Sequence, residues 1–115
     1  MPKPSKERRV APRAPTTLLV SFREGKSAPN SAGFVRAMNL SEQGMLLEMS
    51  DRFQPGDALN FEILLDFESV ARVEGTVVWF IRDHEGMNRA GIEFVNLSRA
   101  QRKLIRDQIA KLPAY

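Results

Sequence analysis

The chain has 115 residues, 43% apolar and 27% charged, which is typical of one globular domain and unlike disordered or membrane-spanning chains. The absence of cysteine excludes disulfides, thiolate metal sites and a cysteine nucleophile. The formal net charge of +3 is unevenly placed, because residues 1–13 carry five cations and one anion whereas the rest of the chain sums to −1.

Residues 1–15 are expected to form a flexible basic arm in front of a folded domain at residues 16–115. Four prolines disfavour a helix here, and the arm has no apolar periodicity. No apolar run approaches the roughly 18 residues that cross a bilayer, and no apolar signal core follows the basic N-terminus. We therefore expect a cytoplasmic protein with no membrane segment.

Two arginines of the arm, Arg9 and Arg13, lie four residues apart, which is about 13 Å on a fully extended backbone. A guanidinium can bond two phosphate oxygens at once, or the O6 and N7 atoms of guanine. The pair therefore suits an anionic or purine ligand, although a tail that only improves solubility would have the same composition.

Alternation of apolar and polar residues, bounded by turn residues, predicts six strands. In the fifth strand Val73, Val77, Trp79 and Ile81 share one side, which predicts that Trp79 lies in the core rather than near the site, where it could stack. Loops are expected at residues 24–32 and 83–88. The predicted strands are residues 16–23, 33–38, 45–49, 58–67, 70–82 and 89–95.

The periodicity becomes helical after Ser98. Ser98 and Gln101 match a capping box, in which each side chain satisfies a free backbone amide of the other residue. Apolar residues then recur at helical spacing until Pro113 ends the run. We expect one amphipathic helix packed across an open part of the sheet. Six strands with short connections and one terminal helix indicate an all-β fold, a small six-stranded antiparallel β-barrel with a C-terminal α-helix.

Residues 39–44, with the sequence NLSEQG, separate the second and third predicted strands. Asn39, Ser41 and Gly44 are residues that stabilise turns through polar side chains or backbone freedom. We call this segment the polar turn. It is either a corner of the scaffold or half of a binding site.

Signatures of catalysis are absent from the sequence. His84 is the only histidine, so histidines cannot cluster around a metal. Ser41 has no base that the sequence identifies, and phosphate loops of the Walker or Rossmann kind are missing. We therefore predict no catalytic residues, no metal site and no cofactor, and a protein that is not an enzyme.

Residues 7–13 (ERRVAPR) and 39–48 (NLSEQGMLLE) together resemble the PilZ family. Its signature is Arg-x-x-x-Arg near the start and Asp/Asn-x-Ser-x-x-Gly after the second strand, and the chain matches both parts. Residues 75–79 (GTVVW) and 91–98 (GIEFVNLS), before a helix, are also similar to the family. The resemblance covers nearly the whole chain.

The resemblance implies a PilZ-like split barrel that binds cyclic di-GMP, a bacterial second messenger. By similarity, Arg9 and Arg13 would hold phosphate and guanine, and Asn39 and Ser41 would bond a guanine. Gly44 would let the backbone turn with no side chain in the way. The ligand carries two phosphate charges and two flat bases, which a flexible cationic arm closing over a rigid turn would complement.

A further basic residue, Arg8, directly precedes the first motif arginine. Family members with this feature resemble one another in binding a self-stacked pair of ligands, so the resemblance implies two cyclic di-GMP molecules per chain. Ligand binding would order the arm and signal to an unidentified effector protein.

Two alternatives to this function stay open at the level of sequence. One is an interaction-only PilZ-like module without nucleotide binding. The other is a small barrel that binds RNA or single-stranded DNA through the arm. The second would need aromatic residues on an exposed strand face for base stacking. Because most of the seven Phe fall on predicted core faces, nucleic-acid binding is disfavoured.

Overall fold

The computed structural model describes residues 14–24, 33–66, 69–82 and 86–111. Residues 1–13 of the predicted arm, with Arg8, Arg9 and Arg13, lie outside the described residues, as do residues 25–32 and His84. The last two residues of the predicted arm, Ala14 and Pro15, pair with the second strand and belong to the first, so the folded domain begins two residues earlier than predicted. The elements in chain order are β1 (Ala14–Glu24), β2 (Gly33–Leu40), β3 (Gly44–Met49), β4 (Ala58–Leu64), β5 (Val70–Arg82), β6 (Asn88–Val95) and α1 (Arg99–Lys111).

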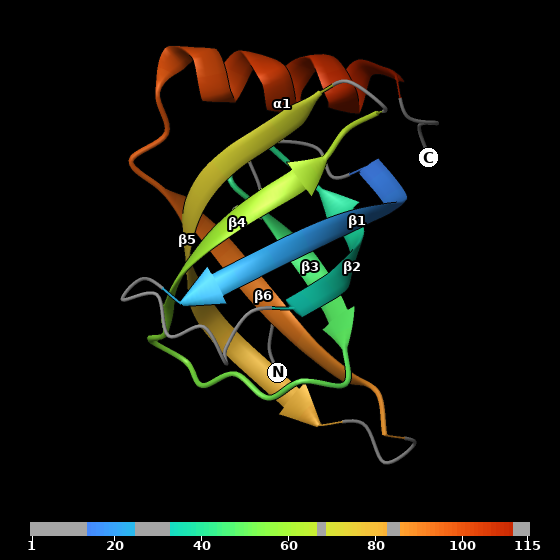
Figure 1. Ribbon diagram of the computed structural model, residues 1–115, viewed down its shortest axis with the longest axis vertical. Coiled ribbons are helices and arrows are strands. Elements are labelled where there is room, and N and C mark those ends of the chain that lie inside the picture. The colour runs from blue at the N-terminus through green and yellow to red at the C-terminus, as the bar shows by residue number, and fades with distance from the viewer. Residues whose placement is uncertain (1–13, 25–32, 67–68, 83–85, 112–115) are drawn as a thin grey trace, which may run out of the picture.

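The six strands form one closed barrel in the order β1-β2-β3-β6-β5-β4 (Figure 1). Every neighbouring pair is antiparallel, and pairing of β1 with β4 closes the barrel, with Val20 opposite Ile63 and Phe22 opposite Phe61. The predicted six-stranded antiparallel barrel with one C-terminal helix is therefore confirmed.

Inward-pointing residues from all six strands form a single core. Full burial of a large apolar side chain contributes about 1.5–3 kcal/mol, so this core is the main source of stability. The ring of Phe53, on the connection between β3 and β4, meets Phe22 edge to face with centroids 5.0 Å apart. The largest fully buried side chains are Phe61, Leu40, Met45, Leu47, Ile63, Ile105, Val20 and Val77.

A register shift in β5 changes which side chains face the core. Val77 pairs with Ile92 but Trp79 pairs with Gly91, so Val78 is an extra residue in β5 with no counterpart on β6. Such a bulge reverses the inward and outward positions beyond it. Trp79 is consequently 40% exposed and Ile81 58% exposed. The prediction that Trp79 lies in the core was wrong.

Strand β4 ends three residues before the predicted boundary. The backbone amides of Leu65 and Asp66 both donate to the carbonyl of Ser69, at 2.9 and 3.4 Å. These bonds close a tight connection to β5, so the chain leaves the sheet although Leu65 is still buried.

Helix α1 lies across one end of the barrel (Figure 1). The predicted capping box is present, because the Gln101 amide donates to Ser98 Oγ at 3.0 Å and the Ser98 amide donates to Gln101 Oε1 at 2.6 Å. Ile105 is fully buried in the core, and the Gln101 side chain donates to the Arg72 carbonyl. The helix covers a barrel end rather than an open part of the sheet, because β1 and β4 leave no opening. In the described ranges, no helix has the length and apolarity to cross a bilayer.

Candidate functional site

The polar turn is held together by the hydroxyl of Ser41. Ser41 is 3% exposed, and its Oγ accepts hydrogen bonds from the amides of Gln43 at 3.1 Å and Gly44 at 3.2 Å. The hydroxyl also donates to the Gly44 carbonyl at 3.3 Å. The same carbonyl accepts a second hydrogen bond, from the Ser41 amide, at 2.9 Å. One donor and two acceptor positions are thus in use, which is the full capacity of a hydroxyl. Ser41 therefore fixes the shape of the turn.

Gly44 is required by its distance to a neighbouring strand. A Cβ atom at this position would lie 2.0 Å from the carbonyl oxygen of Ile92 on β6. The glycines with positive φ in the described residues are Gly56 and Gly86, so Gly44 does not use a left-handed backbone. A glycine is therefore needed here because β3 approaches β6 closely, and not because the backbone adopts a special turn conformation.

Asn39 lies at the end of β2, half-buried, between two irregular ladders. It pairs with Pro15 on β1 and with Leu46 on β3, and the register of each ladder shifts beside it. Bulges of this kind re-aim side chains and are common next to binding sites. Asn39 and Ser41 therefore lie at the same corner of the barrel, where β2 ends.

The polar turn is attached to the last strand and to the helix. The amide of Phe94 on β6 donates to the Gln43 carbonyl at 2.8 Å. The carboxylate of Glu42 is 3.3 Å from the Arg106 guanidinium on α1. Because both contacts come from elements that are anchored in the core, the turn is a stiff part of the barrel.

A hollow of about 200 Å³ opens beside the turn. Ser41 and Gly44 line one side of it, and Trp79 and Gly91 line the other. The indole lies over Gly91, where a Cβ atom would be only 2.3 Å from Nε1. Trp79 thereby offers an exposed flat ring within the same hollow as the polar turn, which is a surface suited to stacking.

Sequence reasoning weighed a stacking position for Trp79 near the site but preferred the core, and so missed its exposure. The signal was present, because residues 77–81 are five consecutive apolar residues in a strand that otherwise alternates. Strict alternation cannot bury all five side chains on one face, so such a run is consistent with a bulge.

The arginine motif lies outside the described residues, but its point of attachment does not. Ala14, which follows Arg13 in the sequence, pairs with Leu40, and Leu40 stands between Asn39 and Ser41. Successive Cα atoms are 3.8 Å apart, so the arm joins the barrel directly at the polar turn.

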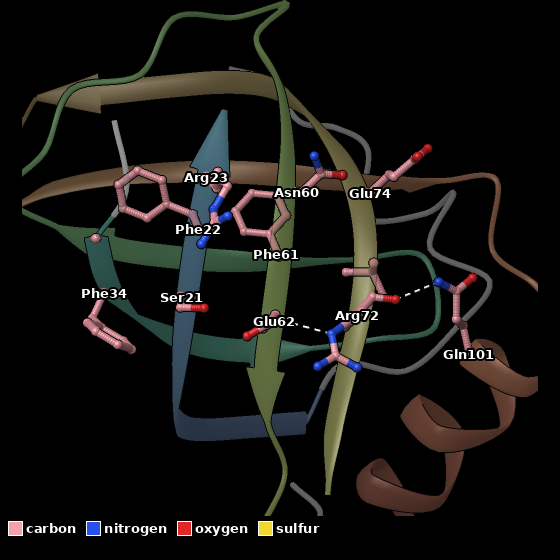
Figure 2. A pocket seen from close by; sticks show the side chains of 12 residues that line it. Ser21, Phe22, Arg23, Phe34, Asn60, Phe61, Glu62, Arg72, Glu74 and Gln101 are labelled. Carbon is pink, nitrogen blue, oxygen red and sulfur yellow. Dashed lines mark hydrogen bonds and ion pairs between the residues drawn. The ribbon is translucent and has the colours of Figure 1, made fainter. Parts of the chain in front are cut away.

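A larger groove of about 710 Å³ lies on the outer face of β1, β4 and β5 (Figure 2). Arg72 and Glu62 form an ion pair of 2.9 Å within it, and Phe34 lies at its border. It contains no residue of the polar turn, and its cations stand among carboxylates. The groove is therefore a poorer match for a doubly anionic ligand than the hollow beside the turn.

The closed barrel, with a stiff polar turn beside an exposed indole, defines the chain as a small antiparallel β-barrel with one terminal helix. The family model for the PilZ domain matches residues 7–111, and the chain belongs to the PilZ family. No curated protein matches the sequence.

Solved structures have the same fold. The PilZ domain of YcgR from Escherichia coli with c-di-GMP matches with a TM-score of 0.75 and 18% identity, covering 91% of each chain. The Bacillus subtilis inhibitor of motility MotI/DgrA matches with a TM-score of 0.76 and 20% identity, covering 96% of this chain and 55% of that one. The K. pneumonia MrkH–c-di-GMP complex matches with a TM-score of 0.73 and 13% identity, covering 87% of this chain and 50% of that one. The chain thus spans about half the length of the last two.

Proposed function

We propose that this protein is a bacterial, cytoplasmic receptor for cyclic di-GMP that orders its N-terminal arm on the ligand and signals to a partner protein. The observation that carries the proposal is the pairing of Ala14 with Leu40. This pairing brings Ala14, the residue that follows Arg13, next to the polar turn, which supports a site in which both halves of the family signature take part.

The charges and surfaces available at this corner suit the ligand. Arg9 and Arg13 supply bidentate donors for phosphate or guanine, and each good bidentate contact contributes about 1–3 kcal/mol. The Trp79 ring beside the turn offers a stacking surface for a purine, an interaction worth about 1–3 kcal/mol per base. The ligand-bearing structures named above share this fold, which supports the proposal.

The polar turn contributes by being rigid before the ligand arrives. Because the Ser41 hydroxyl already makes three hydrogen bonds, it presents Asn39 and the turn backbone in a fixed geometry. Of these bonds, the donation to the Gly44 carbonyl is the longest, at 3.3 Å, and it is the one that a guanine acceptor could replace. Preorganisation reduces the entropy that binding must offset.

Ordering the arm opposes binding. Fixing the backbone costs about 1–2 kcal/mol per residue. Pro12 reduces this cost because it restricts the free state. Several bidentate contacts are therefore needed for tight binding, and Arg8 supplies a third guanidinium. We propose that the chain holds two stacked ligand molecules, with Arg8 on or beside a base.

The receptor has no catalytic step in this proposal. Its output is the altered shape and charge of the face over which the arm closes, and an effector protein recognises that change.

Isothermal titration calorimetry of the full chain with cyclic di-GMP tests the proposal, with GTP as the control nucleotide. We expect saturable binding with a fitted stoichiometry of two nucleotides per chain, accompanied by a change in Trp79 emission. A stoichiometry of one would reject the stacked pair while leaving the receptor in place. No binding at ligand concentrations up to roughly 1 mM would reject the receptor itself.

A further inference from the structure

The outward face of α1 carries four cations in one row. Arg99, Arg102, Lys103 and Arg106 occupy positions i, i+3, i+4 and i+7, and all four side chains are exposed. Residues at this spacing lie on one side of a helix. The row is about 10 Å long at 1.5 Å per residue. We call these four residues the basic face of α1.

The basic face is incompletely neutralised by the rest of the chain. Lys103 is paired with Asp107 at 2.9 Å, and Arg106 is paired with Glu42 at 3.3 Å. Among the residues that the structure describes, Arg99 and Arg102 form no ion pair. Like charges at these spacings repel one another and disfavour the helix. Packing of the buried side of α1 does not require cations on the exposed side, because other polar residues could stand there. The row of four cations is therefore not explained by packing.

The basic face is connected to the polar turn. Glu42, which belongs to the turn, makes the ion pair with Arg106. Arg102 lines a depression of about 270 Å³ together with Glu42 and Gln43. Glu42 therefore places a negative charge at the edge of the basic face.

We infer that the basic face of α1 is the docking site for an acidic segment of the effector protein, and that the Glu42–Arg106 pair makes docking depend on the nucleotide. The inference rests on the proposed function, and it identifies the output surface of the receptor. Ligand phosphates at the polar turn repel the Glu42 carboxylate and weaken its ion pair with Arg106, which frees this guanidinium for carboxylates of the partner.

The surroundings of the basic face favour a protein over other polyanions. Glu42 and Asp107 stand beside two of the cations, so a continuous phosphate backbone would meet carboxylates, whereas discrete carboxylates of a folded partner can avoid them. Helix α1 contains no aromatic residue for base stacking. Its apolar side, with Ile105, is buried in the barrel and unavailable for insertion into a membrane.

The test uses fluorescence anisotropy of the full chain with a fluorescein-labelled, alanine-based helical peptide. The peptide carries glutamates at i, i+3, i+4 and i+7, and its control has the same composition with the glutamates scattered around the helix. The double variant Arg99→Glu/Arg102→Glu is compared with Arg36→Glu/Arg52→Glu, which reverses two exposed arginines away from α1. Duplex DNA and vesicles of phosphatidylserine and phosphatidylcholine are the competing probes.

We expect the patterned peptide to bind more tightly than the scattered one. Reversal at Arg99 and Arg102 should weaken binding about 10-fold or more, whereas the control reversal should leave it within about twofold. Saturating cyclic di-GMP should tighten peptide binding about threefold or more in the wild type and have no effect in Glu42→Gln.

Equal losses in the two double variants, indifference to the arrangement of glutamates, or tighter binding of DNA or vesicles through Arg99 and Arg102 would overturn the inference. Calorimetry of each variant with cyclic di-GMP separates this result from the proposed function. Failure of the wild type to bind nucleotide overturns the receptor, whereas nucleotide binding without any gain in peptide affinity overturns only the docking site.

Discussion

The indole of Trp79 lies over Gly91, its partner across the β5–β6 ladder. A side chain at residue 91 would occupy the space that the ring now fills, and the glycine therefore determines where the chain's only tryptophan points. The same ring forms one side of the hollow beside the polar turn. Gly91 thus determines both the packing of the indole and its position as a candidate ligand contact.

Gly91→Ala should displace the indole, because the new Cβ would lie 2.3 Å from Nε1. We expect a shift in tryptophan emission and a loss of cyclic di-GMP affinity on the order of 10-fold, as the stacking contact is removed. Val70→Ala, at the far end of β5, is the matched control and should leave the emission unchanged. Identical spectra for Gly91→Ala and the wild type would show that the ring does not depend on this glycine.

Ser41→Ala should destabilise the fold as well as the site. The substitution leaves the amides of Gln43 and Gly44 without the oxygen that accepts both, and a buried unsatisfied donor costs about 1–3 kcal/mol. Thermal unfolding measures the effect. Ser21→Ala is the control, because in the described part of the chain the Ser21 hydroxyl makes no hydrogen bond. Equal melting temperatures for the two variants would contradict a structural role for Ser41.

Gly44→Ala should be more damaging than alanine at a glycine that sits in open space. The Cβ atom would collide with the Ile92 carbonyl, which belongs to a backbone that must shift, so we expect a loss of about 2–4 kcal/mol. Gly56→Ala meets nothing within 4 Å, and its φ of 96° adds only local strain of about 1 kcal/mol. Chemical denaturation should therefore rank Gly44→Ala below Gly56→Ala in stability, and the reverse order would contradict the close approach of β3 and β6.

Arg9→Ala or Arg13→Ala should weaken cyclic di-GMP binding on the order of 10- to 100-fold, because each removes bidentate contacts. Lys6→Ala removes a charge from the same arm without touching the motif and should have a smaller effect. Titration calorimetry decides between these outcomes. Near-unchanged affinity for both arginine variants would refute the role assigned to the arm.

Local patterns in the sequence predicted most of the fold. Alternation located all six strands, and the Ser98–Gln101 capping box located the start of α1, because both signals arise from residues close in sequence. Features that depend on a partner strand were not predicted. The extra residue Val78 is defined only by its pairing with β6, so alternation assigned Trp79 to the wrong face.

The candidate site was predicted to a similar degree. The spacing of Asn39, Ser41 and Gly44 indicated a turn with polar side chains, and the structure places them at one corner. The sequence did not indicate that the Ser41 hydroxyl is fully used within the turn, or that Gly44 is required by Ile92, because both facts need coordinates. The ligand contacts assigned to Arg8, Arg9 and Arg13 stay predictions.

The barrel closes through β1 and β4, so each of its six strands has a hydrogen-bonded neighbour on both sides. Recruitment by adding a foreign strand to an exposed sheet edge, a common way for β-proteins to capture peptides, is thereby disfavoured. Recognition of a partner must instead depend on surface side chains, which can change without disturbing the backbone. The polar turn can in this way be retained while the surface of the helix is altered to suit a different partner.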